Sequence, residues 1–168
     1  MKPVIRKARI EDAQSIAEVR TKSWQSTYRG IVSDAYLDNM DIAKVTELWK
    51  QIIAQNPCVY VAETDHIVGF GSAGKNRHPA ITADGEIYLL YLLKECQGIG
   101  IGKMLFLELI QQLYSQSMKS MLIMVLRDNP SKHFYIHMGG RLIKEEEVEI
   151  GGQKLIEEAY MWDDITLH

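Results

Sequence analysis

The chain has 168 residues, 46% hydrophobic and 24% charged, proportions typical of one globular domain with a full hydrophobic core. Its formal net charge of −3 leaves no basic excess to neutralise phosphates, which argues against nucleic acid as a partner. With no apolar stretch of membrane-spanning length, no signal peptide, and only Cys58 and Cys96 as cysteines, we expect a single domain over residues 1–168 in a reducing cytoplasm, without a membrane partner.

The amino-terminal half predicts a strand, three helices and a hairpin. The expected elements are a strand over 4–8, a helix over 11 to about 24, a short helix over 34–40, a helix from 42 to 55, and paired strands over 58–63 and 67–71. The third helix has the clearest amphipathic pattern, and Asp41 is suited to cap its start. Asn56-Pro57 ends that helix.

The carboxyl-terminal half predicts alternating strands and helices followed by a hairpin. A polar loop over 76–84 precedes an apolar strand over 86–93, a helix from about 104 to 117, a strand over 121–126, a short helix over 131–138, and strands ending at 150 and 162. Gly151-Gly152 is the expected turn between the last two strands.

A glycine-rich loop over 97–103 lies between the apolar strand and the helix that follows it. Free backbone N–H groups and the positive end of a helix dipole meet at such a place and bind anions, above all phosphates. A Walker A loop would need glycine at position 97 and Ser or Thr after Lys103, whereas the chain has Gln97 and Met104. A dinucleotide fingerprint would need glycine at position 103, and a glycine turn without a ligand is a further alternative.

Two motifs in this order resemble those of the GNAT superfamily of N-acetyltransferases, over nearly the whole chain. Gln97-x-x-Gly100-x-Gly102 is similar to the family signature Q/R-x-x-G-x-G/A, and residues 129–140, with Phe134-Tyr135, resemble a later family segment. The resemblance implies an α/β (α+β) GNAT fold. Such a fold is a mixed, strongly twisted sheet of about seven strands, with helices on both faces and a split between the fourth and fifth strands.

The resemblance also implies acetyl-CoA as co-substrate, with no metal. The loop would wrap its pyrophosphate through Gln97, Gly98, Ile99, Gly100, Ile101, Gly102 and Lys103. The backbone of Leu92 and Leu93 would pair with the pantetheine arm, and Asn129 would hydrogen-bond to it. Because the spacing from Asn129 to Tyr135 is one residue short of the commonest family pattern, Asp128 is an alternative at this place.

Tyr135 and Glu86 are the expected catalytic residues. In the family a tyrosine at the place of Tyr135 protonates the coenzyme A sulfur; a phenol that titrates near pH ~10 keeps its proton at neutral pH. A structural tyrosine is the alternative. Glu86 matches a glutamate that takes the amine proton in some members, often through water. The alternatives are a solvated carboxylate at a strand end, or an amine that arrives neutral and needs no base.

Trp24, Tyr28 and Glu158 are the expected acceptor-binding residues. Trp24 and Tyr28 are four positions apart on one helix face, where they line the acceptor site or belong to the core. Glu158 lies in an acidic hairpin that attracts a cationic amine or is a solvated edge strand. His133 and His137 have a metal-binding spacing but no evident third ligand, so a solvated helix face is favoured.

The sequence thus predicts a monomeric or homodimeric enzyme that moves the acetyl group of acetyl-CoA to a primary amine. The expected acceptor is a small molecule (polyamine-like, amino-acid-like or drug-like), and transfer is direct, in a ternary complex. A protein N-terminal or lysine amine is an alternative acceptor. A non-catalytic module that binds coenzyme A as a sensor or interaction protein is the alternative from another functional class.

Overall fold

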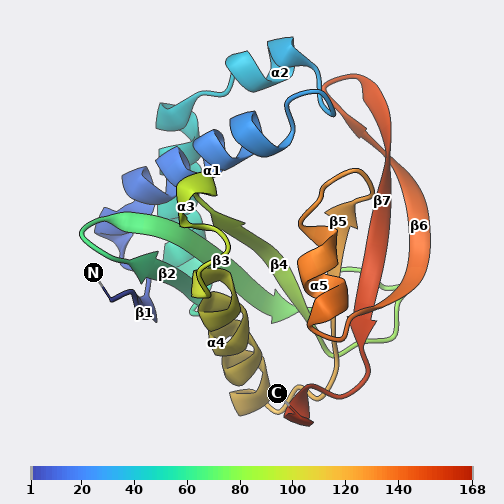
Figure 1. The fold of residues 1–168 in the computed structure, drawn as a ribbon. Helices are drawn as coiled ribbons and strands as arrows, with labels where there is room; N and C mark the ends of the chain where they lie inside the picture. The colour runs from blue at the N-terminus through green and yellow to red at the C-terminus, as the bar shows by residue number, and fades with distance from the viewer. Residues whose placement is uncertain (1, 168) are drawn as a thin grey trace.

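A computed structural model describes residues 2–167 and contains a single seven-stranded sheet in the order β1-β2-β3-β4-β5-β7-β6 (Figure 1). The strands are β1 Val4–Lys7, β2 Val59–Glu63, β3 Ile67–Lys75, β4 Gly85–Leu92, β5 Met121–Leu126, β6 Arg141–Ile150 and β7 Gln153–Trp162. Only β4 and β5 pair in parallel, and the other neighbours are antiparallel. The predicted mixed sheet of about seven strands is therefore confirmed.

Five α-helices and three short 3-10 turns accompany the sheet. The α-helices are α1 Ala13–Thr27, α2 Asp34–Asp38, α3 Ile42–Gln55, α4 Ile101–Ser115 and α5 Lys132–His137. The 3-10 turns are η1 Ile10–Asp12, η2 Lys94–Cys96 and η3 Ile165–Leu167. Asp41 caps α3 as expected, because its carboxylate accepts hydrogen bonds from the N–H groups of Ala43 and Lys44. No helix within residues 2–167 is long and apolar enough to cross a membrane.

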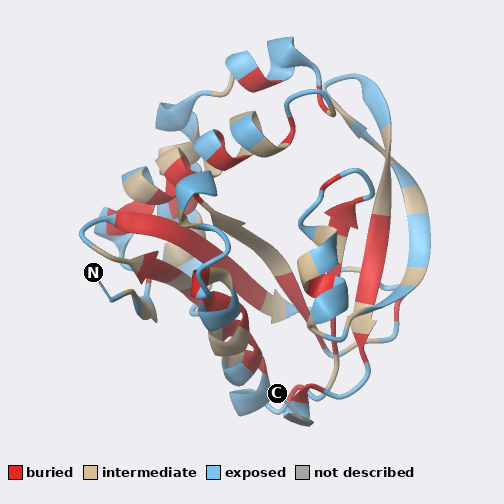
Figure 2. Cartoon of the chain, viewed as in Figure 1, coloured by how far each residue is buried: buried red, intermediate tan, exposed pale blue. Residues whose placement is uncertain are grey.

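Helices cover both faces of the sheet, as the alternation of side chains along β3 shows. On one face Phe70 packs edge-on against Trp49 of α3, with ring centroids 5.1 Å apart. On the opposite face a Cβ atom added at Gly71 would lie only 2.7 Å from Leu109 of α4. Figure 2 shows the resulting buried residues along the middle strands and the inner sides of α1 and α4.

The sheet splits between β4 and β5, which confirms the predicted splay. The two strands pair only at their starts, where Gly85 lies opposite Met121 and Glu86 opposite Leu122. Tyr88 is an extra residue in β4, because Ser72 pairs with Leu89 while Ala73 pairs with Ile87. Such a bulge bends and twists its strand. The bend accompanies the divergence of β4 from β5 (Figure 1).

The last two strands form a long hairpin that reaches the end of α1. Gly151 (φ +59°) and Gly152 (φ +77°) make its turn, as predicted, because both residues have the positive φ that a two-residue turn requires. β7 pairs with β5 on one side and β6 on the other, so β6 is the outer strand. Glu158 of β7 therefore lies on an interior strand and is buried, so the edge-strand interpretation of this residue is wrong.

Candidate active site

Two cavities meet in the split between β4 and β5. The loop cavity, of about 390 Å³, lies against the glycine-rich loop, and the inner cavity, of about 290 Å³, extends toward the end of α1. They share a wall that includes Leu90, Leu92, Gln97, Asn129 and Tyr135. A molecule in one cavity would therefore meet a molecule in the other beside these residues.

The loop cavity is built from backbone that only glycine adopts easily. Gly98 (φ +78°) and Gly100 (φ +94°) have left-handed backbone, and Gly100 is the residue that precedes α4. A Cβ atom at either glycine would meet nothing within 4 Å, so the loop faces open space. Gln97 fixes the loop to the end of β4, because its Nε2 donates to the Leu92 carbonyl at 3.1 Å.

The predicted loop residues contribute in two ways. Gln97, Gly98, Gly100, Gly102 and Lys103 line the loop cavity. Ile99 is 71% exposed and Ile101 is packed in the core, so these two offer backbone groups only. The first N–H groups of α4 have no partner within the helix and lie at its positive end. This arrangement fits the pyrophosphate of acetyl-CoA.

The edge of β4 that faces the split carries Leu90 and Leu92. The Leu93 N–H donates to the Val68 carbonyl at 2.9 Å, so Leu93 is a hydrogen-bonded partner of β3. Hydrogen-bonded and non-bonded pairs alternate in an antiparallel ladder, which turns the backbone groups of Leu92 and Leu90 toward the split. Pairing with the pantetheine arm through backbone groups thus fits Leu92 and not Leu93. Leu90 was not predicted, because the sequence does not give the register between β3 and β4.

Asn129 reaches the cavities and Asp128 does not. Asn129 is buried and lines both cavities; its Nδ2 donates to the Tyr28 hydroxyl at 3.0 Å, and its Oδ1 accepts from the Ser131 N–H at 2.9 Å. The Asp128 side chain is 62% exposed and lies beside Arg127. Of the two candidates for the contact with the pantetheine, the geometry favours Asn129.

Tyr135 is held in the shared wall by aromatic packing. It is 4% exposed, and its ring packs against Phe106 and Phe134 with centroids 6.4 and 5.4 Å away. Burial raises the pKa of Tyr135 above its ordinary value, and the phenols of Tyr91 and Tyr28 add to the rise. The phenol therefore keeps its proton at neutral pH, as a general acid must before it acts.

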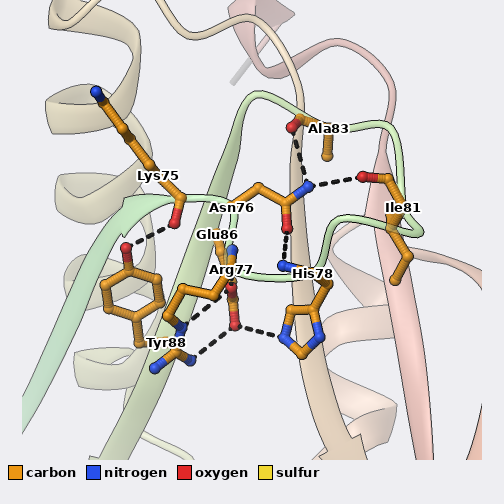
Figure 3. Close-up of polar contacts among 8 residues, drawn as sticks. All are labelled: Lys75, Asn76, Arg77, His78, Ile81, Ala83, Glu86 and Tyr88. Atoms are coloured by element: carbon orange, nitrogen blue, oxygen red, sulfur yellow. Dashed lines mark hydrogen bonds and ion pairs between the residues drawn. The ribbon is translucent and has the colours of Figure 1, made fainter.

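Glu86 is buried, so the interpretation as a solvated carboxylate is wrong. It is 1% exposed, lines the inner cavity and lies under the loop that joins β3 to β4 (Figure 3). Its carboxylate accepts from the N–H, Nε and Nη2 of Arg77 and lies 3.2 Å from His78 Nε2.

Arg77 and His78 also line the inner cavity and were not among the predicted site residues. A hairpin that closes at Lys75 and Gly85 brings the residues after Lys75 back beside Glu86. The sequence prediction ended β3 at Gly71 and not at Lys75, so it did not indicate that Arg77 and His78 return to Glu86.

Trp24 and Tyr28 lie where the acceptor site was expected. Both line the inner cavity, their ring centroids are 4.5 Å apart, and Trp24 Nε1 donates to the Tyr91 hydroxyl at 2.8 Å. Tyr28 is also part of a buried cluster, so the two interpretations of this pair are not exclusive.

Glu158 points away from both cavities, and its neighbour Glu157 lines the inner cavity instead. Glu158 is buried on the other face of β7, where it accepts from Lys132 Nζ at 3.3 Å and from the Tyr160 hydroxyl at 2.9 Å. Of the two glutamates, only Glu157 has a side chain at the cavity, and the face that each strand residue occupies follows from register. Burial raises the pKa of Glu157 above its ordinary value, and the carboxylates of Glu146 and Glu86 contribute to the rise.

Comparison with known proteins agrees with this geometry. The acetyltransferase (GNAT) family matches residues 16–139. An uncharacterized N-acetyltransferase of Bacillus subtilis, YuaI, is 32% identical over 162 residues, covering 96% of this chain and 94% of that protein. The spermidine N(1)-acetyltransferase of Thermoplasma acidophilum is 25% identical, covering 93% of this chain and 96% of that protein.

Solved structures agree as well. The PaiA N-acetyltransferase of Thermoplasma acidophilum, in complex with coenzyme A, superposes with a TM-score of 0.72 at 27% identity, covering 94% of this chain and 98% of that one. A GCN5-related N-acetyltransferase fold from Rhodopseudomonas palustris superposes with a TM-score of 0.75 at 18% identity, covering 96% and 95%. The chain therefore belongs to the GNAT family and is an N-acetyltransferase that uses acetyl-CoA.

Proposed function

We propose that this enzyme transfers the acetyl group directly to a primary amine of a small molecule, in a ternary complex. Acetyl-CoA would bind in the loop cavity through residues 97–103, Leu92 and Asn129, and the amine would bind in the inner cavity between Trp24 and Tyr28. The wall that the cavities share, at Tyr135, would be the place of transfer. Holding both reactants together removes much of the entropic cost of their encounter.

The choice of a small acceptor rests on a contact between two segments that line the inner cavity, the end of α1 and the β6–β7 hairpin. The end of α1 and the segment after it pack against the β6–β7 hairpin (Figure 1). The apolar residues in this contact are Tyr28, Val32, Leu37, Val148, Ile150 and Leu155. Gln153 Nε2 also donates to the Ile31 carbonyl at 3.0 Å. This contact lies across the outer end of the split, where a protein segment would have to pass (Figure 1). A cavity of about 290 Å³ bounded in this way suits a small amine better than a protein segment.

The walls of the inner cavity favour an amine that carries positive charge. Glu157 lines the cavity and, unlike Glu158, is in no ion pair found among residues 2–167. The likeness to a spermidine N(1)-acetyltransferase supports polyamines as acceptors to be tested first.

The residues in the shared wall suit the steps of transfer. Acetyl-CoA supplies the acetyl thioester when bound. As the acceptor nitrogen forms its bond to the acetyl carbon and the C–S bond breaks, Tyr135 donates its proton to the departing sulfur. Burial of Tyr135 keeps that proton in place until the step, and the aromatic packing around its ring limits the positions of its hydroxyl.

A panel of amines with detection of free thiol tests the proposal. Polyamines, diamines, amino acids and short peptides with a free N-terminus or lysine are each added to enzyme with saturating acetyl-CoA. We expect amine-dependent thiol release with small amines and little release with peptides. Efficient release with peptides would replace the small acceptor by a protein amine, and coenzyme A binding without release for any amine would favour a non-catalytic module.

A further inference from the structure

The carboxylate of Glu86 has little capacity left to accept a proton from an amine. Arg77 donates to its Oε1 from the backbone N–H at 3.0 Å and from Nε at 3.3 Å. Arg77 Nη2 lies 2.8 Å from Oε2, and His78 Nε2 lies 3.2 Å from the same oxygen. A carboxylate has about four acceptor positions, and these four contacts occupy them. Glu86 is therefore built to hold its neighbours in place.

The imidazole of His78 has a nitrogen that can still accept a proton, whereas the carboxylate oxygens of Glu86 are all occupied. An ionised carboxylate only accepts hydrogen bonds, so the contact with Glu86 Oε2 places the proton of a neutral imidazole on Nε2. Nδ1 is then left with an unshared electron pair. The His78 side chain is 29% exposed and lines the inner cavity, as Tyr135 does. The buried carboxylate at Nε2 also stabilises the imidazolium that forms when Nδ1 takes a proton.

Asn76 fixes the backbone that carries His78. Its Nδ2 donates to the carbonyls of Ile81 at 2.7 Å and Ala83 at 3.1 Å, and its Oδ1 accepts from the His78 N–H at 2.6 Å (Figure 3). These three contacts close the loop between β3 and β4 around one side chain. The imidazole is thus attached to a loop whose course is held at both ends.

Arg77 is held from a second direction. Its guanidinium carbon lies 3.9 Å from the centroid of the Tyr88 ring, and the Tyr88 hydroxyl donates to the Lys75 carbonyl at 2.6 Å. The residue that the β4 bulge inserts therefore packs under the loop (Figure 3). The bulge, the loop and Glu86 form one structural unit around His78.

Resting on the proposed function, we propose that His78 is the catalytic base that accepts the proton of the acceptor amine, with Glu86 and Asn76 as positioning residues. The neutral amine forms its N–C bond to the acetyl carbon, and its nitrogen becomes positively charged and acidic. His78 Nδ1 takes one N–H proton while the C–S bond breaks and Tyr135 gives its proton to sulfur. The imidazolium then loses a proton to solvent, and the tyrosinate regains one.

Charged and titratable groups face His78 from its own loop and from two strands. Arg77 lies beside it in the loop, and Glu86 contacts it from β4. Tyr88 of β4, which packs against Arg77, and Glu157 of β7 line the same cavity. Protonation of His78 before the reaction removes the base, so we expect kcat to fall on the acid side with one titrating group.

The test compares His78→Gln with His66→Gln, a control in the exposed turn between β2 and β3. We expect His78→Gln to lower kcat by roughly 10²–10⁴-fold and to remove the acid limb of the kcat profile, with KM for acetyl-CoA unchanged. His66→Gln should match the wild type. In His78→Ala, added imidazole should restore part of kcat, which a merely structural role would not produce.

Two results would overturn this inference for different reasons. If wild-type enzyme releases thiol with an amine and His78→Gln keeps its kcat and its acid limb, His78 is not the base. If Glu86→Gln alone removes the acid limb, Glu86 takes the proton itself. Absence of amine-dependent release in the wild type would instead reject the proposed function, and this inference with it.

Discussion

Tyr135 is the residue at which acid catalysis and cofactor binding can be separated. Tyr135→Phe keeps the ring and its contacts with Phe106 and Phe134 and removes only the hydroxyl. We expect kcat to fall roughly 10²–10⁴-fold, because the departing thiolate loses its proton donor. The KM for acetyl-CoA should change little, since one lost hydrogen bond costs about 1 kcal/mol.

Steady-state rates at saturating acetyl-CoA measure this effect, and coenzyme A affinity by calorimetry is the control. A variant with most of its kcat but weaker coenzyme A binding would show that the phenol anchors the cofactor and that water protonates the sulfur.

Glu157 tests the electrostatics of the acceptor cavity. Glu157→Gln should raise KM for a diamine by about tenfold or more, because a hydrogen bond to a charged group contributes about 1.5–3 kcal/mol. Glu149→Gln makes the same change of charge at an exposed position on β6 and should leave KM unchanged. Equal KM values for the diamine in all three proteins would remove Glu157 from the acceptor site.

The pH dependence of that KM has a definite sign. Burial raises the pKa of Glu157, so its carboxylate becomes protonated at a higher pH than an ordinary glutamate. As the pH falls through this raised value, the attraction for a cationic amine is lost and KM should rise. In Glu157→Gln this rise on the acid side should disappear.

A substitution in the first turn of α4 tests whether the glycine-rich loop binds the pyrophosphate of coenzyme A. A Cβ atom at Gly102 would meet only Leu92 Cδ2, at 3.9 Å, and the residue is helical, so valine fits the protein without strain. We expect Gly102→Val to remain folded and to lose coenzyme A affinity, because its side chain would enter the loop cavity. Gln111→Val places the same side chain on the exposed surface of α4 and is the matched control.

Calorimetric titration with coenzyme A, after circular dichroism has verified folding, decides the outcome. Unchanged affinity in a folded Gly102→Val protein would remove the pyrophosphate from this loop.

At the scale of elements, periodicity was sufficient to predict which segments are helices and strands. The apolar stripe of α3 and the glycine loop before α4 are local patterns, and both lie where the sequence placed them. The register between strands was not predictable, because the extra residue Tyr88 in β4 shifts every pair beyond it. The hydrogen bonding of Leu93 to β3 and the direction in which Glu158 faces both depend on strand register, which periodicity alone does not give.

The same limit explains the unpredicted residues of the site. Arg77 and His78 stand in a loop with no periodicity, and their relation to Glu86 depends on where the β3–β4 hairpin closes. Tyr135 and residues 97–103 were predictable because each belongs to one short motif whose geometry is local.

At the scale of the whole molecule, an ion-pair cluster joins the first strand to the rest of the fold. Arg6 of β1 contacts Asp12 at 2.8 Å and Glu63 of β2 at 3.2 Å. The Arg6 guanidinium holds the pKa of Asp12 below its usual range. Because the folded-state pKa is lowered, Asp12 adds stability above its unfolded value of about 3.9 and loses it as the pH falls further.

We expect Asp12→Asn to lower the free energy of unfolding by about 1.5–3 kcal/mol at pH 7, the range for a hydrogen bond to a charged group. The difference in unfolding free energy between the two proteins should narrow as the pH falls below about 4, because Asp12 is then protonated in the unfolded chain and, at still lower pH, in the folded protein too. Urea unfolding at pH 7 and pH 3 measures both values. An equal gap at the two pH values would show that the charge of Asp12 does not stabilise the fold.

Initial rates over a grid of acetyl-CoA and amine concentrations test the central claim of direct transfer most directly. Two cavities that share the wall at Tyr135 let both reactants bind before any bond changes, so double-reciprocal plots should give lines that intersect. Parallel lines would mean that an acetylated enzyme forms and coenzyme A leaves before the amine arrives. Such a pattern would contradict direct transfer between the cavities.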